Sequence, residues 1–278
     1  MQEVGTALPR LVKGPFNSSR IARWCAAQAN WDRIHYDIEY AQKVAKLPYT
    51  IINGALKQHL LCQSLTRAFG AGSWIWRLDF RFTGMDLVGQ SLAVEGRIAD
   101  VSRKSNTARV TVDLRIRNLA SDETTTQGIA VMLVPEAGRA VTDALDLERE
   151  AWPDEPMPSP VSPDLPAQVR ARIGTVIDDV ESYSAVEAGR LRLFAEAVMD
   201  VPAIHYDADA AAAGPYGGLA AMPLYPIHAI SRRPGELELS TDARAMGREG
   251  VCEIGRDLAT VFGFSPTGLL NGGNRVQV

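Results

Sequence analysis

The chain has 278 residues, of which 46% are hydrophobic and 22% charged, and its formal net charge is −4. These values are typical of a globular protein, and the length allows one large domain or two of modest size. The negative charge argues against nucleic acid as a partner, because binding to a phosphate backbone depends on Lys and Arg.

Cysteine spacing and hydropathy indicate a cytoplasmic protein with no metal site. Cys25, Cys62 and Cys252 lie far apart in the chain, so they form neither a zinc-binding spacing nor a complete disulfide framework. Reduced thiols of this kind are usual in the cytoplasm. No apolar run approaches the ~20 residues of a membrane-spanning helix, and the N-terminus lacks the pattern of a signal peptide. We therefore expect no membrane partner.

Two helices are predicted within the first 50 residues. A short strand and turn are expected over residues 4–16, and Asn17-Ser18-Ser19 offers N-cap oxygens for a helix that ends near Asn30. Asp37 is expected to cap a second, short helix over about residues 38–45.

A histidine motif occupies the loop between these two helices. It places an amide (Asn30), a carboxylate (Asp32) and an imidazole (His35) within six residues. An imidazole titrates near neutral pH and can exchange protons with a substrate, and a carboxylate or amide can hold the water involved. The loop is therefore the first candidate for an active site.

The hydrophobic period then changes from helical to extended. Residues 54–69 have apolar side chains at helical spacing and end at Gly70-Ala71-Gly72, which predicts one long amphipathic helix. Four runs with strand-like patterns follow, over about residues 74–82, 92–98, 110–117 and 124–134. This order predicts an α+β domain over residues 1–135, in which a curved antiparallel sheet wraps around one helix.

The rest of the chain reads as a linker and a second, shorter copy of the first unit. Residues 136–166 are rich in Pro and acidic residues, which indicates a linker. In the segment 167–278, the sequence Ile-His-Tyr-Asp of residues 34–37 recurs 170 residues later, at His205, and Asp200 precedes it. Such internal duplication is a primary signal of fold organisation. No counterpart of the long strands follows Pro223, so the second unit is expected to be incomplete.

These features resemble the MaoC-like (R)-specific enoyl-CoA hydratases and dehydratases of the hot-dog fold. That family's signature is an Asp five residues before a His in a loop, followed by a Gly that starts the central helix. Here Asn30 stands five residues before His35, whereas the second copy has Asp200 before His205. The resemblance covers about residues 1–135, extends over about 165–225, and returns weakly at 263–278.

The resemblance implies a lyase of fatty-acid metabolism that adds or removes water at an α,β-unsaturated acyl-CoA thioester. His35 would be the acid/base, with Asn30 or Asp32 as its partner, and the Gly54 N–H would donate to the thioester oxygen. Substrate-binding residues would be Tyr36, Ile52 and Asn53, and Asp200 and His205 would form a possible second site. No cofactor is implied beyond the CoA that the substrate carries.

Two other functions remain open, and both depend on the same fold. The chain could be a non-catalytic subunit that completes the acyl-CoA pocket of a partner hydratase, because Asn30 replaces the usual carboxylate. It could also be an acyl-CoA thioesterase, although Gln58 and Gln63 are the only polar candidates on the long helix besides Asn53. An incomplete second unit would leave a sheet edge exposed, so we expect a homodimer or a hetero-oligomer with another hot-dog chain.

Overall fold

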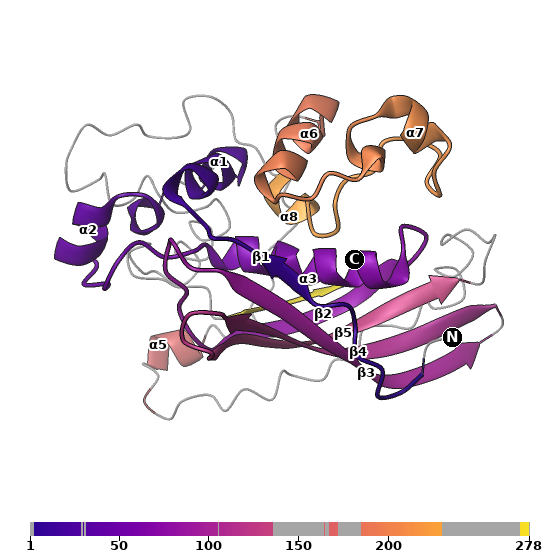
Figure 1. Cartoon of the computed structure of the whole chain (residues 1–278), viewed down its shortest axis with the longest axis horizontal. Coiled ribbons are helices and arrows are strands. Elements are labelled where there is room, and N and C mark those ends of the chain that lie inside the picture. The colour runs from indigo at the N-terminus through magenta and orange to yellow at the C-terminus, as the bar shows by residue number, and fades with distance from the viewer. Residues whose placement is uncertain are drawn as a thin grey trace.

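The computed structural model describes residues 3–28, 30, 32–104, 106–135, 164, 167–171, 185–229 and 273–277. It is built on one antiparallel sheet with the long helix α3 (Gly54–Phe69) lying on one face. Figure 1 shows α3 between the sheet on one side and smaller helices on the other. This is the predicted α+β hot-dog architecture.

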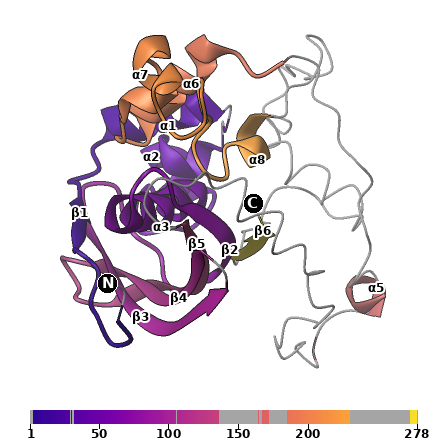
Figure 2. The ribbon, with the colours of Figure 1, turned by 90° about the vertical axis from the view of Figure 1, so that its right-hand side faces the viewer.

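The sheet has six strands in the order β1-β3-β4-β5-β2-β6. Its centre consists of the four predicted strands, β2 (Trp74–Phe82), β3 (Leu92–Lys104), β4 (Thr107–Asn118) and β5 (Thr124–Pro135). Two short strands extend it, β1 (Leu11–Lys13) beside β3 and β6 (Gly273–Gln277) beside β2. Figure 2 shows β6 next to β2. In the sequence, β1 is the first of the six strands and β6 is the last. The end of the second half therefore completes the sheet of the first.

Helix α3 is buried far more completely than its amphipathic pattern predicts. All ten residues from Leu56 to Leu65 are buried, including His59, which is only 2% exposed. The sheet covers the apolar side, and helices α1 (Ser18–Gln28) and α6 (Ala188–Ala197) lie over the other side. The polar side of α3 is thus an interior surface between the two halves of the chain.

A buried ion pair ties α3 to the segment that leads into β3. Lys57 Nζ lies 2.6 Å from Asp86 Oδ2, and the two side chains are 3% and 0% exposed. Asp86 also accepts hydrogen bonds from Asn118 and Thr125, each at 2.8 Å. Burial lowers the pKa of Lys57, and the negative charge of Asp86 opposes that shift. Removal of either charge would therefore leave the other buried and unpaired, which would destabilise the fold.

The second half repeats the first in local structure. The 3-10 helices η1 (Arg33–His35) and η2 (Ala203–His205) are each followed by a short helix, α2 (Ile38–Lys43) and α7 (Ala208–Ala212). Asp37 caps α2 as predicted, and Asp207 caps α7 in the same way. After that, the described part of the second half contains the one-turn helix α8 (Pro226–Ala229) where the first half begins α3. The predicted linker, 136–166, lies outside the described residues except for Asp164.

Four rings, Trp24, His59, Phe194 and His228, form an aromatic cluster between the halves. Trp24 and Phe194 lie 5.3 Å apart between ring centroids, and the two imidazoles lie 5.1 Å apart. Trp24 and Phe194 are separated by the same 170 residues as His35 and His205, so they occupy equivalent positions in the two copies. Burial lowers the pKa of His59 well below its ordinary value and that of His228 to about 4.

The described helices also bear on the membrane prediction. Among them, none is both long enough and apolar enough to cross a bilayer.

Candidate active site

The first histidine motif forms a compact, buried turn. Asp32 accepts a hydrogen bond from the Ile34 N–H at 3.2 Å, and Asn30 Oδ1 accepts one from the Asp32 N–H at 3.1 Å. His35 is 7% exposed, and its Nδ1 lies 2.9 Å from the carbonyl oxygen of Ile51. Because a carbonyl only accepts, Nδ1 is the donor and Nε2 carries the lone pair. Burial lowers the pKa of His35, and the Ile51 carbonyl and Asp32 oppose that shift.

The other residues predicted for this site lie at the start of α3. Gly54 begins the helix, and its N–H is one of the donors that the helix itself leaves free. A Cβ at Gly54 would lie 2.7 Å from the Phe82 ring, so a larger residue here would have to displace that ring. Ile52 and Asn53 are buried at 4% and 1% exposure, whereas Tyr36 is 40% exposed. The structure therefore brings Asn30, Asp32 and His35 together and leaves Tyr36 largely at the surface.

The second motif shares the hydrogen bond from the histidine to a backbone carbonyl, but its carboxylate comes earlier. Asp200 stands five residues before His205, and Pro202 replaces Asp32 as the N-cap of the 3-10 helix. His205 Nδ1 lies 2.7 Å from the carbonyl oxygen of Ala220, as His35 Nδ1 does from that of Ile51, so its Nε2 is again the free acceptor. Asp200 is 6% exposed, and its Oδ1 accepts a hydrogen bond from the Arg67 guanidinium at 3.0 Å. A base with a fixed tautomer thus shares this turn with an acidic side chain.

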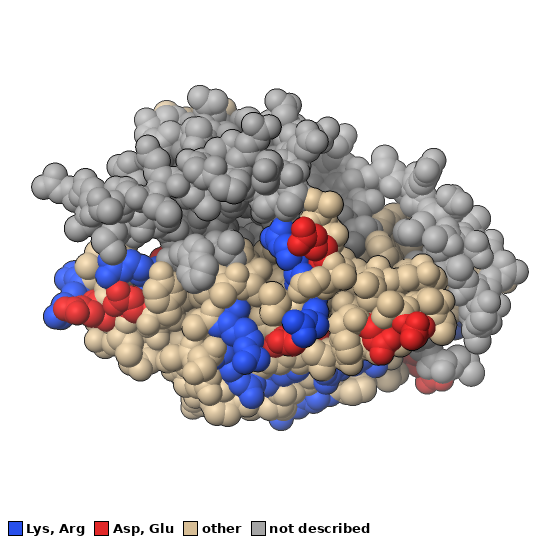
Figure 3. Space-filling model, turned by 90° about the horizontal axis from the view of Figure 1, so that it is seen from above, with Lys and Arg blue, Asp and Glu red and all other residues tan. Residues whose placement is uncertain are grey.

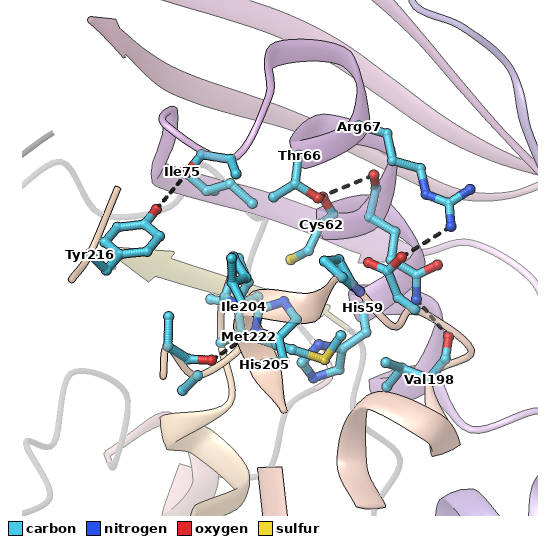
Figure 4. A pocket seen from close by; sticks show the side chains of 18 of the residues that line it. His59, Cys62, Thr66, Arg67, Ile75, Val198, Ile204, His205, Tyr216 and Met222 are labelled. Atoms are coloured by element: carbon cyan, nitrogen blue, oxygen red, sulfur yellow. Dashed lines mark hydrogen bonds and ion pairs between the residues drawn. The ribbon is translucent and has the colours of Figure 1, made fainter. Parts of the chain in front are cut away.

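A cavity of about 690 Å³ opens beside the second motif and not the first. Both Asp200 and His205 line it, together with residues of α3 and the start of β2. His35 and Gly54 are not among its lining residues. Figure 4 shows His205 near the middle of this space, with His59 and Arg67 of α3 on one side. The first half therefore supplies one wall of a pocket whose other wall is the second motif.

Residues of the first half hold the turn that carries Asp200. Gln63 Nε2 donates to the Val198 carbonyl at 2.6 Å, and Lys13 Nζ donates to the carbonyl of Met199. Met199 has a φ of 58°, a left-handed conformation that is uncommon for a residue with a side chain. Contacts from α3 and β1 therefore stabilise a backbone geometry that the second half alone would not favour.

Sequence reasoning missed Gln63 as an anchor and Arg67 as a member of the site. Their spacing is the signal that was available, because His59, Gln63 and Arg67 follow one another at intervals of four residues on one side of α3. That pattern indicates a polar stripe along one side of the helix. The partners of Gln63 and Arg67 lie in a segment more than 130 residues further along the chain.

Positive charge gathers where the turn meets the solvent. Arg67 is 53% exposed, and the exposed Arg20 contacts the Met199 sulfur at 2.7 Å. Burial, then Arg67, lowers the pKa of Lys13, while Asp200 opposes the shift. On the described part of the face shown in Figure 3, basic and acidic groups are interspersed. On the strands, Arg115 pairs with Glu95 at 2.7 Å. Cations on the strands are thus partly neutralised by neighbouring carboxylates, whereas the turn that carries Asp200 has more cations than carboxylates.

The chemistry of these side chains does not suggest a metal centre. In the described part of the chain, no group of three or more His, Cys, Asp or Glu side chains has the geometry to hold a metal ion. Cys62 lines the cavity, but burial raises the pKa of its thiol so far that a reactive thiolate is not favoured.

Dehydratase family models match both halves of the chain. The model of hydroxyacyl-thioester dehydratase type 2 matches residues 10–88, and the model of the FAS1-like dehydratase domain region matches residues 171–275. A comparison with curated proteins found no match.

Solved structures share the fold. A protein described as a MaoC domain dehydratase, from Chloroflexus aurantiacus J-10-fl, is 14% identical with a TM-score of 0.58, and the match covers 90% of this chain and 72% of that one. The (R)-hydratase from A. caviae involved in PHA biosynthesis is 24% identical over 48% of this chain and 98% of its own, with a TM-score of 0.44. The ChsH1–ChsH2 complex from Mycobacterium tuberculosis contains a chain that is 17% identical over 49% of this chain and 100% of its own, with a TM-score of 0.42.

Proposed function

The chain belongs to the MaoC-like hot-dog hydratases and dehydratases, and we propose that it adds or removes water at an α,β-unsaturated acyl-CoA thioester. One observation carries the proposal: Asp200 and His205, at the family's spacing, both line the 690 Å³ cavity. Cavities of this size are typical of sites that enclose a small organic ligand.

His205 is the proposed acid/base. Its Nε2 takes a proton from water as the water oxygen bonds to the β-carbon of the substrate, and it then gives a proton to the α-carbon. Asp200 accepts a hydrogen bond from the same water and orients it. The reverse sequence removes water. Because Nδ1 is fixed on Ala220, the imidazole presents Nε2 throughout.

Arg67 is the proposed donor to the thioester oxygen. The carbonyls of Ile51 and Ala220 bind the two histidines, so these residues occupy equivalent positions in the two copies. Three residues further on, the first copy has Gly54 and the second has Pro223. Proline has no N–H to donate. Arg67 lines the cavity and retains further N–H groups beyond the one on Asp200. Loss of such a donor typically lowers the rate by ~10²–10³.

The substrate class rests on the cations at the mouth of the site. We propose that Lys13 and Arg20, which lie at the same turn as Arg67, attract the phosphates of CoA. Raising the ionic strength should then raise KM, and the effect should be smaller in Arg20→Ala. No cofactor is needed beyond the CoA of the substrate, and we propose a cytoplasmic homodimer or hetero-oligomer.

The first copy offers a specific alternative. It has the N–H of Gly54 but Asn30 in place of the acid, whereas the second copy has the acid but Pro223 in place of the donor. Each copy thus lacks one group, which favours a second candidate: a subunit that completes the pocket of a partner hydratase.

Paired histidine variants test these assignments. The purified chain should hydrate crotonyl-CoA or a longer 2-enoyl-CoA, measured as loss of the absorbance of the conjugated thioester. His205→Ala should lower kcat/KM by ~10²–10⁴, and His35→Ala, the matched control, should retain activity.

The other outcomes are equally informative. If activity survives His205→Ala and is lost in His35→Ala, the site is in the first copy. Activity that needs a partner chain and survives both changes supports the subunit. Release of free CoA identifies a thioesterase.

A further inference from the structure

A glycine-rich segment of the second half has no role in the proposed reaction. Residues 214–218, Gly-Pro-Tyr-Gly-Gly, follow α7 and precede Ala220, whose carbonyl binds His205. Gly217 has a φ of 66°, which favours glycine, and a Cβ added at Gly217 or Gly218 would meet nothing within 4 Å. These glycines therefore serve the backbone path and not close packing. The path presents a single large side chain, Tyr216.

Tyr216 reaches across to the first half at one end of the cavity. Its hydroxyl donates to the Ala71 carbonyl at 3.0 Å, and its ring meets Trp74 edge-on with centroids 6.4 Å apart. Tyr216, Ala71 and Trp74 all line the cavity, and Tyr216 is 39% exposed. The ring therefore separates the cavity from solvent at this end, held by one hydrogen bond and one ring contact.

The proposed reactive groups lie away from Tyr216. Figure 4 shows Tyr216 on one side of the cavity and Arg67 on the other, with His205 between them. If the CoA phosphates approach the cations near Arg67 and the thioester reaches His205, the acyl group points toward Tyr216. Side chains toward that end are suited to an apolar acyl chain: Ile75 lies there in Figure 4, and Trp74 contacts the Tyr216 ring.

We propose that Tyr216 closes the acyl end of the cavity and sets the longest acyl group that the protein accepts. This inference rests on the proposed function, because it takes an acyl-CoA as the ligand. Tyr216 is a specificity-determining residue in this scheme and touches the end of the acyl chain, not the reacting atoms. Each methylene buried in the cavity should raise kcat/KM about fourfold, until the chain reaches Tyr216.

Chain-length profiles of variants test the inference. For 2-enoyl-CoAs of increasing length, kcat/KM of the parent should rise, reach an optimum and fall. Tyr216→Ala should open the end to solvent and move the optimum to longer chains, with gains of tenfold or so for substrates past the parent's limit. Tyr216→Phe should keep the parent's optimum, since the ring remains and only the bond to Ala71 is lost.

Tyr206→Ala is the matched control. Tyr206 is also an exposed tyrosine of the second half, at 45%, and does not line the cavity. Its removal should leave the profile unchanged. If Tyr216→Ala changes kcat/KM by one common factor at every chain length, or if Tyr206→Ala shifts the optimum equally, the inference is wrong.

Binding separates this inference from the proposed function. Calorimetric titration with saturated acyl-CoAs needs no chemistry, so the length dependence of Kd should shift in Tyr216→Ala even if the chain hydrates no enoyl-CoA. A shifted Kd profile without turnover would overturn the proposed activity and support the role of Tyr216. Turnover of enoyl-CoAs with an unshifted Kd profile would support the proposed activity and overturn the role of Tyr216. The absence of any acyl-CoA binding would overturn both the activity and the role of Tyr216.

Discussion

Acidification from pH 7 to pH 5 should weaken the fold through its aromatic cluster. His59 and His228 are buried, and the pKa of each imidazole lies below its ordinary value of 6.5, that of His228 at about 4. The unfolded chain therefore binds protons between pH 6.5 and 4 that the folded chain does not. Stability is complete above the unfolded pKa and is lost as the pH falls.

The size of the effect follows from the shift. For a group with an unfolded pKa of 6.5 and a folded pKa of about 4, the linkage relation gives a loss of about 2 kcal/mol between pH 7 and pH 5. Burial, and then the charge of His228, also lower the pKa of His59, so protonation of this imidazole acts in the same direction. Acidification over this range should therefore cost at least about 2 kcal/mol, a substantial part of the stability of a typical domain.

Urea unfolding at a series of pH values measures the loss, with tryptophan fluorescence as the signal. The matched variant is His228→Phe, which keeps a ring against Phe194 and removes one titrating group. Its free energy of unfolding should fall by about 2 kcal/mol less than the parent's between pH 7 and pH 5. A parent whose stability is constant over this range, or a variant with the parent's slope, would refute the reasoning.

Two further predictions concern the core. Lys57→Met leaves Asp86 buried without its cation and should lower the free energy of unfolding by about 3–5 kcal/mol, measured by thermal unfolding. Lys43→Met, the same change in a surface ion pair, should leave Tm unchanged. Equal changes in Tm would contradict the role of burial. Gly54→Ala drives a Cβ into the Phe82 ring, so Tm should fall, and Phe82→Leu in the same chain should restore part of the loss. Failure of that rescue would show that the cost of Gly54→Ala lies elsewhere.

Features that depend on near neighbours in the sequence were predictable. Asp37 caps α2 because its carboxylate reaches an N–H three residues on, and β4 alternates because its side chains point to opposite faces of one sheet. The repeated histidine motif was also visible, and its two copies share the same hydrogen bond to a carbonyl. Each of these features depends either on a partner within about 16 residues or on a simple period in the sequence.

Features that join the halves were not predictable. The polar side of α3 suggested solvent, yet Gln63 bonds to Val198, 135 residues away. The cavity lies beside His205 because α3 of the first half supplies one of its walls, and no local pattern near His205 records that. For the same reason His35 was the expected base from sequence, since its own copy contains the Gly-led helix.

The aromatic cluster also decides how the chain can be divided in the laboratory. Trp24 and His59 come from the first half, and Phe194 and His228 from the second, so neither half has a complete interior. The Pro-rich segment at 136–166 is the obvious place to cut by composition. A fragment that ends there would present the buried side of α3 and the Trp24 ring to water, a surface that favours aggregation. Expression of both halves together, on one chain or as co-produced fragments, is therefore the route to a soluble sample.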